Sequence, residues 1–232
     1  METFCKLWIF IGAIDSGHHE FVRHILDYVN EPCQIFAIDE ERNLKNIYNQ
    51  QITHTSFFSL GNLLSTEERN IILLPHDINL ADSINEMYNI FKEYNIEVEK
   101  VISIADAQIF IDKKQVLLDA MAHFSDILFI YDSKSQLKKP QIDEFIHHCK
   151  KQECYPLPIE YISKKSEHLN ELFFDDHRRM TLVFDDIDPV DMINLDDNNL
   201  PTESFTIPTV DQLDKYLARD DMGKRNLQIP EF

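Results

Sequence analysis

Glycine is unusually scarce in this chain of 232 residues, which contains only 4. Average usage of roughly 7% would give about 16 glycines at this length. Such a low glycine content excludes collagen-like and Gly-linker proteins, and it disfavours β-rich folds with many tight turns. The chain is 44% hydrophobic and 27% charged. It is therefore long and apolar enough to bury the core of one globular domain, with or without an appendage.

Positive charge is also scarce, because 22 Lys and Arg residues stand against 41 Asp and Glu residues, a net charge of −19. Proteins that bind nucleic acids or anionic membranes over a broad surface use Lys and Arg to neutralise phosphate groups. We therefore expect neither a nucleic acid nor a membrane as a partner. A small local phosphate site is still compatible with this charge balance.

Cysteines and long apolar runs are lacking as well. The 4 cysteines show no spacing typical of secreted disulfide proteins. The first apolar run, residues 7–11, is far too short to span a membrane and has no signal-peptide cleavage pattern. We therefore expect a cytoplasmic protein. The stretch HHCKKQEC at residues 147–154 lacks the paired CxxC spacing of structural zinc sites, so we interpret it as a polar helix end.

Short apolar runs alternate with amphipathic stretches through most of the chain. Strands are predicted at residues 7–11, 34–38, 70–74, 101–105, 127–131 and 157–162, and helices at 20–29, 60–69, 81–94, 115–124, 140–151 and 167–174. Continuous apolar strands separated by helices indicate βαβ units whose strands are buried on both faces of a parallel sheet. We predict an α/β fold, with a mostly parallel sheet and flanking helices in three layers.

The composition changes near residue 175, which predicts a division of the chain. We expect one domain over residues 1–175, an acidic linker or loop over 176–200, and a short C-terminal appendage over 201–232. The linker is strongly acidic, since residues 175–214 contain eleven acidic residues and only Arg178 and Arg179 as basic ones.

Two of the four glycines, Gly12 and Gly17, follow the first predicted strand with four residues between them. This is the glycine spacing of the phosphate-binding loop GxxxxGK[ST], which lies between a strand and a helix. The chemistry differs, because His18 and His19 occupy the places of the lysine that contacts phosphates and the hydroxyl that holds Mg²⁺. Asp15 adds a carboxylate, and one like-charge contact at about 4 Å can cost up to roughly 4 kcal/mol. The two glycines thus keep the bend of the loop, but Asp15, His18 and His19 impair the tight binding of a triphosphate.

Three further segments carry a family resemblance: NIILLPHDINLADS at 70–83, VISIADAQIFID at 101–112 and AHFSDILFIYDSKSQL at 122–137. Together with the loop, their order and spacing resemble the CobW/HypB/UreG family of P-loop GTPases, and its CobW branch most closely, over about residues 6–175. The resemblance implies a P-loop NTPase-like fold. Residues 204–217 resemble a remnant of that family's small C-terminal domain, with the sequence SFTIPTVDQLDKYL.

The functional positions that the resemblance points to are altered together. The base-reading motif NKxD falls on residues 131–134, so Lys134 replaces the aspartate that accepts hydrogen bonds from guanine. The metal-binding CxCC motif falls around ITHTSFFSLGNLL, with His54, Ser56 and Phe57 where the cysteines belong. The loss of phosphate, base and metal residues at once indicates that GTP chemistry is not retained.

The candidate site residues fall into three groups, and we assign no catalytic residue. The altered phosphate loop comprises Gly12, Asp15, Ser16, Gly17, His18 and His19. The expected pocket rim comprises Asp39, Glu40, Asp106, Tyr131, Asp132 and Lys134. The candidate metal ligands are His18, His19 and His54. The sequence around His19, Glu20 and His24 misses the HExxH zinc-protease spacing by one residue.

Three functional hypotheses follow. The first is a degenerate, non-hydrolysing relative of the CobW-type GTPases that acts as a binding or scaffold module. The second is an active GTP-dependent metallochaperone that uses non-standard histidines; GTP with Mg or Zn would be its cofactors if the altered loop still binds. The third is an interaction protein whose acidic segment, residues 185–200, docks a basic partner. The protein partner is unknown in all three.

Overall fold

The computed structural model describes residues 6–14, 23, 32–38, 52–65, 68–75, 79–94, 96–107, 115–132, 137–151, 159–163, 179, 181–185, 212 and 214–229. The predicted helices at 20–29 and 167–174 lie outside the described residues, except for the helical Arg23.

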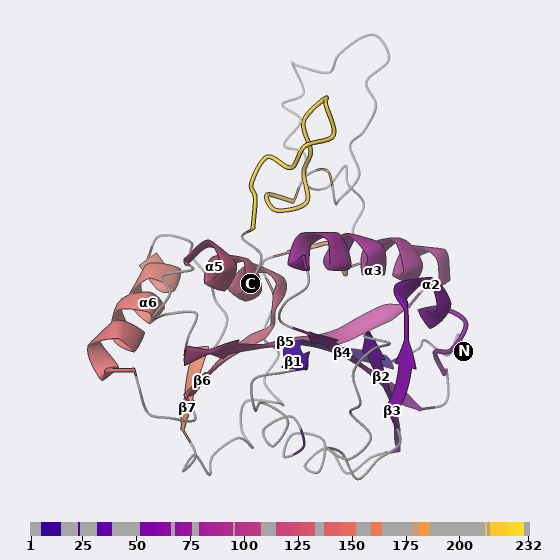
Figure 1. Cartoon of the computed structure of the whole chain (residues 1–232), viewed down its shortest axis with the longest axis horizontal. Helices are drawn as coiled ribbons and strands as arrows, with labels where there is room; N and C mark the ends of the chain where they lie inside the picture. The colour runs from indigo at the N-terminus through magenta and orange to yellow at the C-terminus, as the bar shows by residue number, and fades with distance from the viewer. Residues whose placement is uncertain are drawn as a thin grey trace, which may run out of the picture.

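A seven-stranded sheet forms the centre of the molecule, with all its strands parallel and in the order β3-β2-β4-β1-β5-β6-β7 (Figure 1). The strands are β1 (Lys6–Ile14), β2 (Cys33–Ile38), β3 (Ile52–Thr55), β4 (Arg69–Pro75), β5 (Glu97–Asp106), β6 (Ile127–Asp132) and β7 (Ile159–Ser163). The predicted α/β class with a mostly parallel sheet is confirmed. The first strand in the chain, β1, is the middle strand of the sheet.

The described helices lie on one face of the sheet (Figure 1). They are α2 (Phe57–Leu60), α3 (Leu80–Tyr94), α5 (Gln115–Phe124) and α6 (Lys139–Lys151). Each of these helices lies in a connection whose second strand is nearer to β7 than its first strand. Because crossovers between parallel strands are right-handed, helices in connections that run in the same direction lie on the same face of the sheet. The connections from β1 to β2 and from β2 to β3 step the other way. The direction therefore reverses between β1 and β5, where open α/β sheets bind their ligands beyond the carboxyl ends of the strands.

The residues of the central strand β1 are buried on both faces of the sheet. Alternate residues of a strand point to opposite faces. Leu7, Ile9 and Ile11 of β1 belong to the core cluster shared with α3 and α5. Trp8 and Phe10, which alternate with them, are 6% and 0% exposed. A sheet buried on both faces explains why its strands are continuous apolar runs.

Two local predictions are wrong. The helix predicted at 60–69 is instead the short helix α2, which ends at Leu60 and is followed by a turn over residues 61–63. The edge strand β3 was not expected, because its sequence ITHT is too short and too polar to show an apolar run. Among the described helices, none combines the length and apolar character that a membrane-spanning helix needs.

Candidate functional site

The candidate site lies at the carboxyl edge of the sheet, where β1 ends beside β4 and β5. Gly12 is the first residue of the predicted phosphate loop and lies within β1. Its φ is 76°, a backbone conformation that favours glycine. A Cβ at this position would lie 2.5 Å from the carbonyl oxygen of Ile104 in β5. The close approach of two central strands thus requires glycine here, whether or not a ligand binds.

The strand β1 continues past Gly12 to Ile14, which pairs with Pro75 of β4 after an irregularity in the register. Half of the segment between Gly12 and Gly17 therefore belongs to the sheet. A phosphate cradle is made from successive backbone N–H groups of a loop that turn toward one anion. Only Asp15 and Ser16 separate the end of β1 from Gly17.

Two of the predicted rim residues lie side by side at this edge. Asp106 is the last residue of β5 and is paired with Tyr131 of β6. Tyr131 is buried, and Asp106 is half-buried. Because β5 is the direct neighbour of β1, the fold brings both residues to the same edge as Gly12.

The third described rim residue, Asp132, is bound to the backbone of its own loop. Its carboxylate is buried, and one of its oxygens accepts a hydrogen bond from the backbone N–H of Leu137 at 2.8 Å. This bond ties the end of β6 to the residues that lead into α6. The geometry gives Asp132 a structural role in closing the segment between them.

His54 lies far from the phosphate-loop edge of β1. The register places His54 of β3, Ala37 of β2, Leu73 of β4 and Phe10 of β1 in one row across the sheet. Three strand spacings of about 4.8 Å separate His54 from Phe10, a distance of about 14 Å.

The remaining predicted site residues lie outside the described part of the chain: Asp15, Ser16, Gly17, His18, His19, Asp39, Glu40 and Lys134. Their roles stay predictions. Within the described ranges, no three His, Cys, Asp or Glu residues come together in a way that could hold a metal ion.

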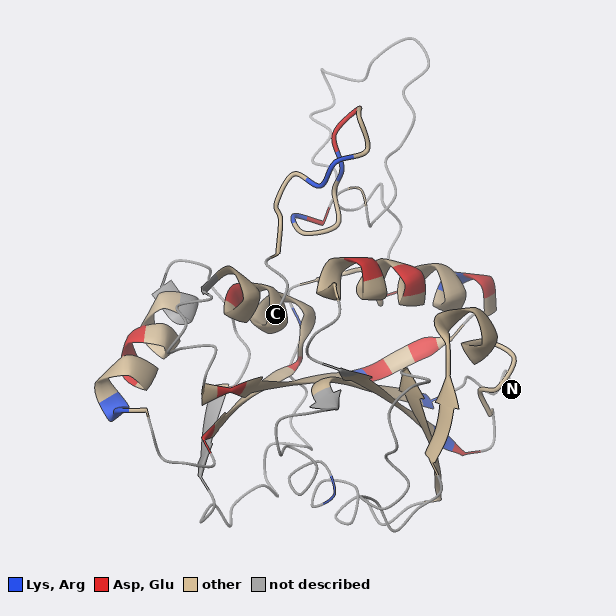
Figure 2. Cartoon of the chain, viewed as in Figure 1, with Lys and Arg blue, Asp and Glu red and all other residues tan. Residues whose placement is uncertain are grey.

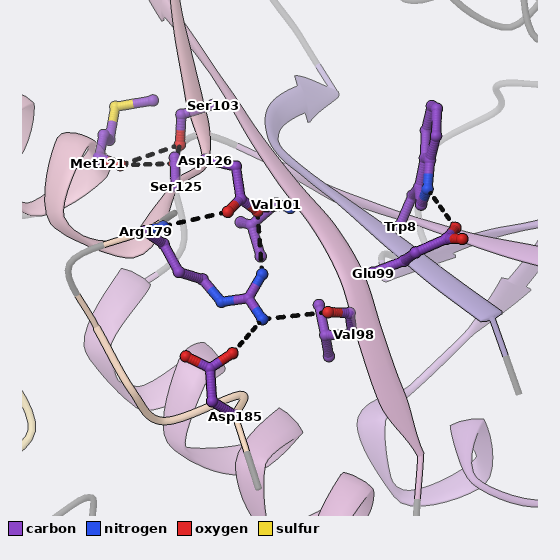
Figure 3. A network of polar contacts seen from close by, with 10 residues as sticks. All are labelled: Trp8, Val98, Glu99, Val101, Ser103, Met121, Ser125, Asp126, Arg179 and Asp185. Carbon is purple, nitrogen blue, oxygen red and sulfur yellow. Dashed lines mark hydrogen bonds and ion pairs between the residues drawn. The ribbon is translucent and has the colours of Figure 1, made fainter. Parts of the chain in front are cut away.

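A buried ion pair that the sequence patterns did not reveal lies at the opposite, amino edge of the sheet (Figure 3). The guanidinium of Arg179 donates to Asp126 at 3.0 Å, to Asp185 at 2.7 Å and to the carbonyl oxygen of Val98 at 3.1 Å. Asp126 also accepts the backbone N–H of Val101 at 2.7 Å. Both members of the central pair are buried, and removing one partner of such a pair typically costs about 3–5 kcal/mol. This cluster holds the chain around residue 179 on the sheet.

A second buried cluster fastens the C-terminal segment to the end of α5. The carboxylate of Asp214 lies 2.7 Å from Nε2 of His123 and accepts the hydroxyl of Thr181 at 2.7 Å. Its other oxygen accepts the backbone N–H of Tyr216 at 2.9 Å. The ring of Tyr216 packs against His123 and Phe124. Burial alone raises the pKa of Asp214, but the hydrogen bond and charge of His123, with the Thr181 and Tyr216 hydrogen bonds, outweigh it and hold the pKa below 3.8.

These two clusters bear on the predicted division of the chain. Residues 179–185 fall in the predicted acidic linker, and residues 214–217 fall in the predicted appendage, yet both sets pack on the domain core. One sequence feature could have indicated a buried ion pair here: the two arginines at 178 and 179 lie within an otherwise acidic stretch. The boundaries at 175 and 200 stay predictions.

Comparisons with known proteins do not assign this chain to a family. No family model matches it, and no curated protein matches its sequence. One similar solved structure is the Zn(II)-bound YjiA GTPase from E. coli, at 12% identity and a TM-score of 0.42. That match covers 72% of this chain and only 59% of the YjiA chain. A similarity this low assigns neither a ligand nor an activity, so the sheet topology itself carries the fold class.

We predict that Gly12→Ala destabilises the fold far more than Gly223→Ala. Both glycines have φ near 77°, but nothing lies within 4 Å of a Cβ at Gly223. Alanine at either position strains the backbone by about 1–3 kcal/mol, and at Gly12 it must also displace β5, at about 1–3 kcal/mol more. Urea unfolding gives both free energies. Equal losses would show that the contact with Ile104 does not constrain Gly12.

We also predict a pH-dependent contribution from Asp214. Because its folded pKa lies below 3.8, its ionised form stabilises the fold above about pH 4, and this stability is lost as the pH falls through the lowered pKa. Asp214→Asn should therefore cost about 1–3 kcal/mol near neutral pH and progressively less in acid. The exposed Asp143→Asn on α6 is the matched control and should have little effect. A constant cost for Asp214→Asn from about pH 7 to about pH 3 would contradict the prediction.

Proposed function

We propose that this protein is a non-hydrolysing relative of the CobW-type P-loop GTPases that acts as a binding or scaffold module. One observation carries the proposal: the residues for phosphate, Mg²⁺ and base recognition are replaced together in a chain that keeps a P-loop NTPase-like sheet. His18 and His19 replace the lysine and the hydroxyl, and Lys134 replaces the aspartate that reads guanine. One such change could adjust an active site, whereas the joint change removes three separate functions.

The residues present do not fit a Mg²⁺–GTP complex. A neutral imidazole gives less charge stabilisation than the ammonium that contacts the β- and γ-phosphates. Mg²⁺ prefers oxygen ligands, which His19 does not offer. Asp15 would place a carboxylate near the phosphates, and Lys134 has no acceptor for the guanine donors. We therefore derive no catalytic step through GTP.

The geometry at Gly12 supports the same proposal. Gly12 matches the glycine spacing of a phosphate loop, but the contact with the Ile104 carbonyl gives it a structural reason to be glycine. The continuation of β1 to Ile14 also draws part of the predicted loop into the sheet. The glycine spacing can thus persist without phosphate binding.

A titration with mant-GTP and Mg²⁺ tests this proposal. The natural chain should show no binding in the micromolar range and no phosphate release. A variant that combines Asp15→Gly, His18→Lys, His19→Ser and Lys134→Asp is the matched comparison, and it should gain affinity because it regains the missing contacts. Micromolar binding by the natural chain, together with measurable phosphate release, would refute the proposal.

A further inference from the structure

Three large apolar side chains are exposed on α2, on the turn that follows it and at the end of α3. We call this set, Phe58, Leu63 and Tyr94, the α2–α3 corner. Phe58 is 95% exposed, and Leu63 and Tyr94 are 41% and 42% exposed. Figure 1 shows α2 packed beside the C-terminal end of α3. Isolated exposed apolar residues are ordinary, but three on one helix–turn–helix contact, one of them a fully exposed aromatic ring, indicate an interaction site.

The corner is built into the fold and does not result from a loose segment. Leu60 of α2 is fully buried, and Phe57 packs against the core, so the helix must present Phe58 outward. The hydroxyl of Tyr94 donates to Oδ1 of Asn62 at 3.3 Å. A Cβ at Gly61 would lie 2.5 Å from the ring of Tyr94. The absence of a side chain at Gly61 therefore lets this ring lie directly over the turn after α2.

The surroundings of the corner are acidic. Segments 56–69 and 92–100 contain five glutamates against two lysines and one arginine. The arginine, Arg69, is paired with Glu99 at 3.4 Å. Glu68, Glu93 and Glu97 are exposed. Lys92 has its ammonium over the ring of Tyr88, one turn back along α3, at 5.7 Å. Figure 2 shows acidic residues along α3 and at the start of β5, beside an α2 that carries no charge.

We propose that the α2–α3 corner docks a basic, aliphatic segment of a partner protein. Aliphatic side chains would cover Leu63 and the edges of the rings, and Lys or Arg side chains would lie over the faces of Phe58 and Tyr94, as cations do on aromatic rings. The exposed glutamates would attract the same cations. A second copy of this chain is disfavoured as the occupant, because each copy carries a net charge of −19.

This docking surface does not depend on the fate of the phosphate loop. Tyr94 precedes the amino end of β5, whereas Gly12 lies at the carboxyl edge of the sheet. Loss of nucleotide binding and loss of partner binding are therefore separable. A chain that bound GTP could still dock a partner at the corner.

A short fluorescein-labelled peptide that alternates lysine and leucine is a direct probe, measured by fluorescence anisotropy. The natural chain should bind it, and Phe58→Ser should weaken binding at least about fivefold because an anchor aromatic is lost. Glu93→Lys should weaken binding as well, by reversing one charge of the rim. Met222→Ser is the matched control, since Met222 is 89% exposed in a C-terminal turn and should leave the affinity unchanged. Matching peptides with glutamate for lysine, or with serine for leucine, should not bind.

Two results would overturn the proposal. The first is that the natural chain and Phe58→Ser bind the lysine–leucine peptide with equal affinity, or that neither binds it. The fluorescence of Trp8, the one tryptophan of the chain, checks that the variant is folded. The second is concentration-dependent self-association in analytical ultracentrifugation that Phe58→Ser abolishes. That outcome would make a second copy the occupant of the corner.

Discussion

The close approach of β1 and β5 at Gly12 is the constraint on which the candidate site depends. The carbonyl oxygen of Ile104 occupies the space that a Cβ of residue 12 would need. Because β1 is the central strand and pairs on both sides, any displacement there would disturb the whole sheet. Glycine at this position is a requirement of packing. The affinity of the loop for an anion must come from other residues.

The residues that would supply this affinity differ from those of the phosphate-loop motif. A phosphate loop combines backbone N–H groups with a cation and a metal-holding oxygen. This chain has two histidines and an added carboxylate in the same segment. Oriented backbone groups alone can attract an anion, but Asp15 opposes them. The charges of this segment therefore oppose the tight binding of an anion.

The sequence predicts the fold well, because buried parallel strands such as β4 and β6 are continuous apolar runs. Helices such as α5 show apolar residues at a clear helical spacing. It misses β3, whose two threonines and one histidine hide the strand. It also misses the contacts of Arg179 with Asp126 and of Asp214 with His123, which join residues 53 and 91 positions apart. Local spacing carries no information on such pairs. At the site, the sequence predicts that Gly12 begins a phosphate loop, whereas the structure places Gly12 within β1 and supplies a packing reason for the glycine.

The most direct measurement of the central claim is the urea unfolding of the full chain with and without GTP and Mg²⁺, followed through Trp8. A ligand that binds only the folded state stabilises it by about 2.7 kcal/mol when present at about 100 times its Kd. The account predicts the same unfolding midpoint in both conditions, even at millimolar nucleotide. A stabilisation that grows with nucleotide concentration would contradict it, since the loop would then still bind a triphosphate.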